Sequence, residues 1–158
     1  MSAVLDMSPD RIRSMRPDDL NAVMTIETEI YDYPWTRGIF QDCMRVGYQC
    51  HVYQQDNEIK AYSVLSLGAA EAHVLTLCVR PDSQQQGLGR MMMEHMIELA
   101  RQAGTETILL EVRPSNAHAI RLYQQLGFNE VGSRPDYYPA AEGREDALIM
   151  AYSLLPDA

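Results

Sequence analysis

Apolar positions recur along the chain with periods that predict helices in some stretches and strands in others. Pro17, followed by Asp18 and Asp19, predicts a helix start, because proline fits the first helical position and acids favour the positive end of the helix dipole. The helix continues with apolar residues at helical spacing: Leu20, Val23, Met24 and Ile30. A Tyr-Pro-Trp-Thr run at 33–36 predicts a break, and Thr36 can cap a second helix.

The middle of the chain predicts strands. Residues 11–15 form a short candidate, and two longer ones follow at 49–55 and 59–67, joined by a polar turn that indicates a hairpin. Residues 72–79 are apolar almost throughout, which favours a central strand buried on both faces.

Helices and strands alternate in the rest of the chain. A glycine-containing loop at 84–90 leads into a helix that ends at Gly104. Its apolar stripe comprises Leu88, Met92, Met96, Leu99 and Ala103. A strand at 107–112, a helix at 116–126 with Ser115 or Asn116 as cap and Gly127 as stop, and strands at 128–133 and 147–154 complete the pattern. This order predicts an α/β domain built on a mixed sheet.

Length and apolar content indicate a single soluble domain. The 158 residues suit one domain spanning 1–158, and residues 1–10 are expected to be loosely ordered. No uncharged run approaches the roughly 20 residues of a membrane span, and the first ten residues lack the apolar core of a signal peptide. We therefore expect a cytoplasmic protein with no membrane association.

The net charge and the spacing of the cysteines limit which partners and ligands we expect the protein to bind. The net charge of −9 argues against a nucleic acid partner, which needs a basic footprint. An acidic surface suits a cationic substrate, although it can equally serve solubility alone. The three cysteines lack disulfide or zinc spacing, so we expect free buried thiols and no metal site. No oligomeric state is predicted.

The sharpest local motif is Gln84-Gln85-Gln86-Gly87-Leu88-Gly89-Arg90, between a strand and a helix. Glycines let the backbone approach a ligand closely, and the N–H groups of a helix start attract anions. No Lys-Ser or Lys-Thr follows the glycines, which excludes a Walker loop, and Met92 replaces the third glycine of a dinucleotide fingerprint. The motif alone leaves a pyrophosphate site and a ligand-free helix start equally open.

Several motifs together resemble the GNAT acetyltransferases. They are the Gln84-x-x-Gly87-x-Gly89 signature, the run Glu111-Val112-Arg113-Pro114-Ser115-Asn116, the segment 119–123 and Leu126-Gly127-Phe128. The resemblance implies the GNAT fold, with a central mixed, mostly antiparallel sheet flanked by about four helices. It is strong from residue 75 to residue 150 and weaker earlier, where it depends on the 33–36 run.

The closing stretches 137–139 and 143–150 resemble, more particularly, bacterial enzymes that acetylate the N-terminal alanine of a small-subunit ribosomal protein. This resemblance implies that the acceptor is the N-terminal tail of a basic ribosomal protein. The net charge is compatible with such a target.

The resemblance also implies an acetyl-CoA site. The backbone of one strand would hold the pantetheine and acetyl group, at Leu77, Cys78 and Val79. Backbone N–H groups would hold the pyrophosphate, at Gln85, Gln86, Gly87, Leu88, Gly89 and Arg90. The Asn116 side chain would touch the cofactor. Glu111 would act as general base and Tyr123 as general acid.

Chemistry agrees with these roles while leaving alternatives. An α-amine with a pKa of about 7.7–8.0 must lose a proton before it attacks a thioester, and a carboxylate at a strand end could take it. Glu111 fits if its strand splays beside the cofactor strand, but Glu27 or Glu29 could also serve. A phenol can protonate a departing thiolate, yet a tyrosine at the spacing of Tyr123 is often a core residue.

The remaining candidates have equally ordinary alternatives. Asn116 would cap a helix even without a cofactor. Trp35 could line an acceptor groove or join two helices. Tyr137 and Tyr138 fall in a polar, proline-containing stretch interpreted as a loop, where exposed aromatic rings favour acceptor binding.

Three functions therefore compete. The first is an N-terminal peptide acetyltransferase, and the second is a small-molecule amine acetyltransferase with the same cofactor chemistry. The third is a CoA-binding regulatory domain without turnover, which the presence of both a candidate base and a candidate acid argues against.

Overall fold

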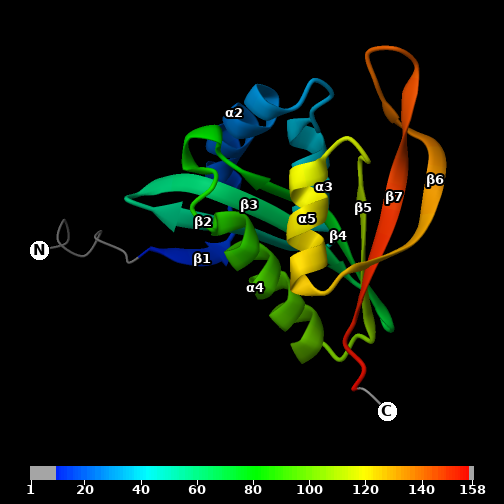
Figure 1. Cartoon of the computed structure of the whole chain (residues 1–158). Coiled ribbons are helices and arrows are strands. Elements are labelled where there is room, and N and C mark those ends of the chain that lie inside the picture. The colour runs from blue at the N-terminus through cyan, green and yellow to red at the C-terminus, as the bar shows by residue number, and fades with distance from the viewer. Residues whose placement is uncertain (1–9, 157–158) are drawn as a thin grey trace, which may run out of the picture. The chain divides into compact units, whose positions relative to one another are not determined.

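The computed structural model describes residues 10–156, so most of the N-terminal segment expected to be loosely ordered, residues 1–9, lies outside the described part. Figure 1 labels the elements. In chain order they are β1 (Arg11–Ser14), η1 (Pro17–Asp19), α2 (Leu20–Ile30), α3 (Arg37–Arg45), β2 (Gln49–Gln55), β3 (Glu58–Leu67), β4 (Glu71–Val79), η2 (Pro81–Ser83), α4 (Leu88–Gln102), β5 (Thr107–Val112), α5 (Ala117–Leu126), β6 (Asn129–Pro139) and β7 (Arg144–Ser153).

The described strands form a seven-stranded sheet in the order β1-β2-β3-β4-β5-β7-β6. β4 and β5 pair in parallel, whereas β1–β2, β5–β7 and β6–β7 pair antiparallel. Together with the four described α-helices, this mixed sheet confirms the predicted fold class. The chain divides into two compact units, one comprising residues 10–64 and 76–93 and the other 65–75 and 94–156 of the described part.

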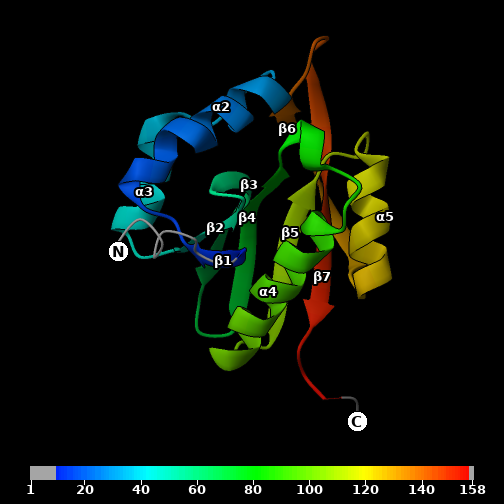
Figure 2. The ribbon, with the colours of Figure 1, turned by 90° about the vertical axis from the view of Figure 1, so that its left-hand side faces the viewer.

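In the first unit, helices cover both faces of the strands. α2 and α3 lie together on one side of β2 and β3, as Figure 2 shows. They enclose an apolar cluster that includes Leu20, Phe40 and Tyr62, while the start of α4 packs on a second cluster with Tyr53 and Met92. Burying these large side chains supplies the hydrophobic stabilisation of this unit.

The helix boundaries of the first unit follow the sequence signals. α2 is preceded by the 3₁₀ turn η1, with proline at its first position. Thr36 caps α3, since its side-chain oxygen accepts a hydrogen bond of 3.2 Å from the Ile39 N–H. Asp56 and Asn57 have φ of 53° and 63°, values typical of a tight hairpin turn between β2 and β3. All these predictions are confirmed.

In the second unit, α5 packs on the strands through aromatic rings. The centroid of Phe128 lies 5.9 Å from that of Tyr123 and 5.4 Å from that of Tyr152. Asn116 caps α5 by accepting from the Ala119 N–H at 3.2 Å, and Gly127 ends it with a φ of 113°. Both ends of this helix were predicted.

The β6 strand is longer than predicted. It runs to Pro139 rather than ending near residue 133, so Tyr137 and Tyr138 lie in a strand and the loop assignment is wrong. β6 is the edge strand of the sheet, where proline is tolerated because its missing N–H is not needed for pairing. The register shifts between Arg134 and Tyr138, and Asp136 adopts a φ of 51° within this irregularity.

Candidate functional site

The loop before α4 has the geometry expected of an anion site. Gln85 and Gly87 adopt φ of 65° and 81°, and the helix then begins with the Met91 N–H bonded to the Gly87 carbonyl at 3.0 Å. Gln84 donates from Nε2 to the Val79 carbonyl at 3.1 Å, which ties the loop to the end of β4. The first N–H groups of an α-helix have no partner inside the helix and can bind a phosphate.

The end of β4 carries the predicted pantetheine residues. Leu77 and Val79 pack beside the cluster under α4, and Cys78 is buried in the cluster under α2 and α3. Burial raises the pKa of the Cys78 thiol to about 11, despite hydrogen bonds with the Tyr62 and Tyr31 side chains. A buried thiol that stays protonated is a poor nucleophile. This supports direct attack by the amine without an acetyl-enzyme.

Glu111 lies in β5 with three polar side chains around its carboxylate. His73 Nε2 and Arg134 Nη2 each lie 3.5 Å from Glu111 Oε1. Tyr137 hydrogen-bonds Glu111, and this bond, with burial, raises the pKa of Tyr137. The Glu111 side chain is 11% exposed. A carboxylate so enclosed, yet within reach of solvent, can exchange a proton with a substrate.

Tyr123 and Tyr138 belong to the same cluster. Burial raises the pKa of Tyr123 to about 12. The pKa of Tyr138 is raised to about 12, by burial first and then by the Glu111 charge, and both Tyr137 and Tyr123 also influence it. The second unit therefore brings together the predicted base, the predicted acid and both predicted acceptor tyrosines.

Arg113 and Glu145 form an ion pair that fixes the segment after β5. The Arg113 guanidinium lies 4.4 Å from the centre of the Tyr138 ring and donates to Glu145 at 3.1 Å. Glu145 also accepts from the Ser115 N–H at 2.9 Å, just before the Asn116 cap of α5. Asn116 is thus confirmed as a cap, and its contact with a cofactor stays a prediction.

Glu27, an alternative base, is committed to the protein core. It is 3% exposed, and its two carboxylate oxygens accept from the Tyr62 hydroxyl at 2.6 Å and from the backbone N–H of Trp35 at 2.8 Å. The Trp35 ring lies 5.2 Å from that of Phe40 and is partly buried. These contacts support the interpretation that Trp35 joins α2 to α3, while its exposed part leaves a role in acceptor binding as a prediction.

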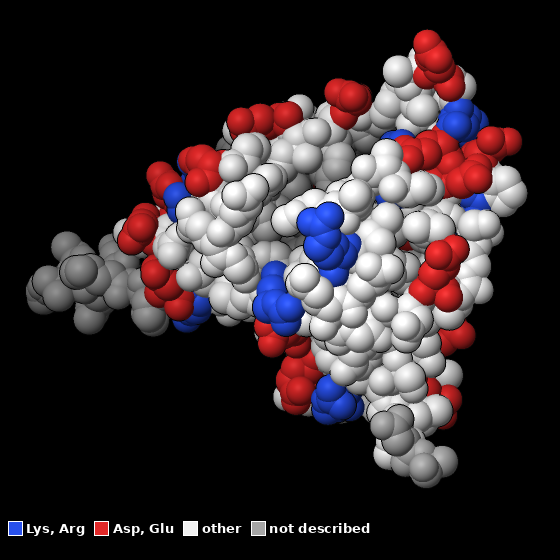
Figure 3. Space-filling model, viewed as in Figure 1, with Lys and Arg blue, Asp and Glu red and all other residues white. Residues whose placement is uncertain are grey.

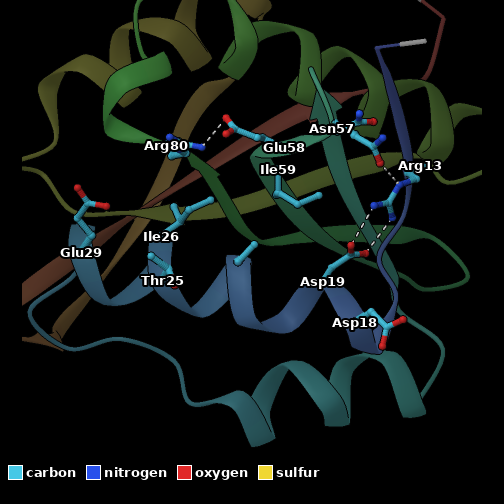
Figure 4. Close-up of a pocket in the computed structure, with 12 residues that line it drawn as sticks. Arg13, Asp18, Asp19, Thr25, Ile26, Glu29, Asn57, Glu58, Ile59 and Arg80 are labelled. Carbon is cyan, nitrogen blue, oxygen red and sulfur yellow. Dashed lines mark hydrogen bonds and ion pairs between the residues drawn. The ribbon is translucent and has the colours of Figure 1, made fainter. Parts of the chain in front are cut away.

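A separate pocket of about 530 Å³ lies beside α2 in the first unit. Figure 4 shows Arg13 at its wall, with hydrogen bonds of 2.8 and 2.9 Å to the two carboxylate oxygens of Asp19. Arg13 also donates to Gln54 at 2.8 Å, and Arg80 binds Glu58 at 3.2 Å. Glu29, the other alternative base, lines this pocket. Because both of its arginines, Arg13 and Arg80, are bound to carboxylates of the same pocket, we interpret the pocket as structural.

Acidic side chains outnumber basic ones in the chain, 22 to 13. On the face that Figure 3 shows, Asp and Glu lie mostly toward the edges, a few separated Lys or Arg lie among them and near the middle, and most of the face carries neither. Within residues 10–156, no group of three or more His, Cys, Asp or Glu side chains could hold a metal ion. No helix in this range has the length and apolar content needed to cross a membrane.

Sequence analysis missed three residues in and around the Glu111 cluster. They are His73 and Arg134, which lie beside Glu111, and Glu145, which binds Arg113 and Ser115. His73 could have been found from the pairing of β4 with β5, because it faces Leu109 across the parallel ladder. The side chains of Leu109 and Glu111, two residues apart on one strand, point to the same face.

A mixed sheet with a glycine-containing loop at the start of α4 and a carboxylate–tyrosine cluster around Glu111 of β5 is the arrangement expected of an acetyl-CoA-dependent acetyltransferase. The sequence model of the Acetyltransferase (GNAT) family matches residues 20–128, and the chain belongs to this family. Membership confirms the predicted enzyme class and acetyl-CoA as its cosubstrate.

Relatives of known name agree with this membership. The chain is 41% identical to the ribosomal protein bS18-alanine N-acetyltransferase of Escherichia coli K12, over 89% of this chain and 95% of that protein. The crystal structure of the Escherichia coli ribosomal-protein-S18-alanine N-acetyltransferase superposes with a TM-score of 0.87 at 38% identity, covering 94% of this chain and 96% of that one. Ard1 from Thermoplasma volcanium gives a TM-score of 0.85 at 26% identity, covering 94% of this chain and all of that one, 100%.

Proposed function

We propose that this protein transfers the acetyl group of acetyl-CoA to the α-amine of the N-terminal alanine of ribosomal protein bS18. The observation that carries the proposal is the Glu111–Tyr123–Tyr138 cluster in a chain 41% identical to an enzyme of that name. The net charge of −9 suits a basic protein tail as the acceptor.

The donor binds along the predicted cofactor residues. N–H groups from Gln85 to Arg90 hold the pyrophosphate at the start of α4, where the helix dipole favours an anion. The backbone at Leu77, Cys78 and Val79 hydrogen-bonds the pantetheine and the acetyl group. Asn116 contacts the cofactor from the start of α5. The positive φ at Gln85 and Gly87 supports the loop part of this assignment.

Glu111 acts as the general base. It removes a proton from the α-ammonium group, whose ordinary pKa of about 7.7–8.0 leaves most of it protonated at pH 7. Its low exposure and its position among polar side chains support this role. The hydrogen bonds that hold Glu27 in the core argue against the alternative base.

Tyr123 acts as the general acid toward the departing thiolate. With a pKa of about 12, it stays protonated wherever the enzyme works, but donation to a thiolate of ordinary pKa, about 8.5, runs uphill. We therefore infer that the second amine proton replaces the phenol proton as it leaves. Tyr137 and Tyr138, with Trp35, would contact the acceptor tail.

The proposed function also bears on the domain organisation of the chain and on where in the cell the protein acts. We propose one GNAT domain over residues 1–158, supported by a family match that begins in one compact unit and ends in the other. We also propose that the protein acts in the cytoplasm, where ribosomal proteins are made.

The test is thiol release from acetyl-CoA with a panel of acceptors. The panel contains a peptide copying the N-terminus of the host's bS18, the same peptide with a blocked α-amine, polyamines and free amino acids. We expect turnover on the free peptide alone. Turnover only on small amines would leave the family in place and contradict the acceptor, and binding of acetyl-CoA without turnover would favour a regulatory domain.

A further inference from the structure

His73 and Glu111 face each other because of the sheet register. His73 pairs with Leu109 across the parallel β4–β5 ladder, and Glu111 lies two residues beyond Leu109 on the same face of β5. His73 Nε2 lies 3.5 Å from Glu111 Oε1, slightly beyond hydrogen-bond distance. The imidazole is more open to solvent than the carboxylate, with side-chain exposures of 36% and 11%.

We propose that His73 is a positioning residue for Glu111 that receives the amine proton from the carboxylate and releases it to water. The proposal rests on the role of Glu111 as general base. It assigns a function to a residue that neither the sequence motifs nor the family match singles out.

The other groups around Glu111 cannot accept this proton. Arg134 carries a guanidinium group, which has hydrogen-bond donors and no acceptor. Tyr137 already hydrogen-bonds Glu111, and its raised pKa keeps the phenol protonated. Burial and the nearby charge of Glu111 raise the pKa of Tyr138 to about 12, so this phenol also stays protonated. Among these described neighbours of Glu111, the His73 imidazole is the one with a ring nitrogen that can accept a proton.

The overall reaction releases one proton, so Glu111 must pass on the proton that it takes from the amine. The acceptor enters as R–NH₃⁺, and the products are the acetamide, CoA–SH and one free proton. Glu111 takes the first amine proton, and the nitrogen lone pair forms the C–N bond while the C–S electron pair leaves on sulfur. The second amine proton neutralises the thiolate by way of Tyr123. The first passes from Glu111 Oε1 to His73 Nε2, which restores the carboxylate and leaves an imidazolium to lose its proton to water.

The test is the pH profile of kcat/KM for wild type and His73→Gln, with the bS18 N-terminal peptide and saturating acetyl-CoA. We expect wild type to exceed the variant about tenfold near pH 7, below the range for losing a direct general base. The two should agree within about twofold at pH 9, because the α-amine is then already free.

A merely structural role would give a ratio that does not change with pH, and that result would overturn the proposal. His118→Gln, the same change at an exposed histidine of α5, should match wild type at every pH. Added imidazole should restore His73→Ala at pH 7 in a saturable manner, and failure to do so would also count against it. Failure of the proposed function itself looks different: wild type would not acetylate the peptide, or Glu111→Gln would keep the full rate.

Discussion

At the scale of single residues, the site depends on how the surroundings of each titratable group differ. Glu111 keeps polar neighbours and partial access to solvent, whereas Glu27 has both oxygens committed to hydrogen bonds in the core. Both glutamates were candidate bases from the sequence, which records the residue type and not its neighbours. Burial separates them, and it also holds Cys78 and Tyr123 in their protonated forms.

Replacing Glu111 with glutamine should lower kcat/KM at pH 7 by about 100-fold or more, because the amide has no basic site for the amine proton. The loss should become smaller at pH 9, where the acceptor amine is already free. Initial rates of thiol release across this pH range measure the effect. Glu29→Gln, at the pocket beside α2, is the matched control and should behave as wild type. An equal loss at both pH values would contradict a role in proton removal.

Tyr123→Phe should lower kcat by about 100-fold with little change in the KM for either substrate. The phenyl ring preserves the contact with Phe128, so folding should be retained. Steady-state kinetics at saturating acetyl-CoA, together with the circular dichroism spectrum, provide the measurement. If kcat stays within a few-fold of wild type, the thiolate leaves without help from this phenol.

At the scale of elements, the sequence predicted helix ends and the β2–β3 hairpin correctly, but it did not predict the full length of β6. Thr36, Asn116 and Gly127 mark helix ends through chemistry that a few neighbouring residues decide, and the structure confirms all three. The length of β6 depends instead on its place at the sheet edge and on its irregular register with β7. Neither property can be inferred from the residues of β6 alone. The contact between His73 and Glu111 escaped prediction for the same reason.

The β1–α2 connection supplies a test of stability against pH. Burial by itself would raise the pKa of Asp19, but the hydrogen bonds from Arg13 and the Arg16 N–H outweigh it and lower the pKa. A lowered folded-state pKa adds stability that is present above the unfolded value, about 3.9, and is lost as pH falls through the folded value. Asp19→Asn should therefore cost about 2–3 kcal/mol at pH 7, because it leaves the largely buried Arg13 without its carboxylate partner.

Urea unfolding at pH 7 and at pH 3 measures this contribution. The difference between wild type and Asp19→Asn should be smaller at pH 3, where the Asp19 carboxylate begins to protonate in the folded state. Asp18→Asn is the control, since it removes the same charge at the exposed neighbouring position and should change stability little. A difference that is equal at the two pH values would show that the ion pair does not supply the stability.

At the scale of the whole molecule, the acidic surface should act on a basic acceptor before binding. A field from 22 acidic and 13 basic side chains raises the encounter rate with a cationic tail, and salt screens it. The kcat/KM for the bS18 peptide should fall several-fold between about 50 and 500 mM salt. A peptide with its downstream Lys and Arg replaced by Gln should be far less sensitive. Equal salt dependence for both peptides would show that the charge of the acceptor does not contribute to its selection.

The most direct test of the acceptor assignment is tandem mass spectrometry of intact bS18 after incubation with the enzyme and acetyl-CoA. Our account predicts a single acetyl group on the α-nitrogen of the N-terminal alanine, formed by wild type and lost with Glu111→Gln. Acetylation confined to lysine side chains, or an unmodified bS18 in the presence of an enzyme that acetylates small amines, would contradict it.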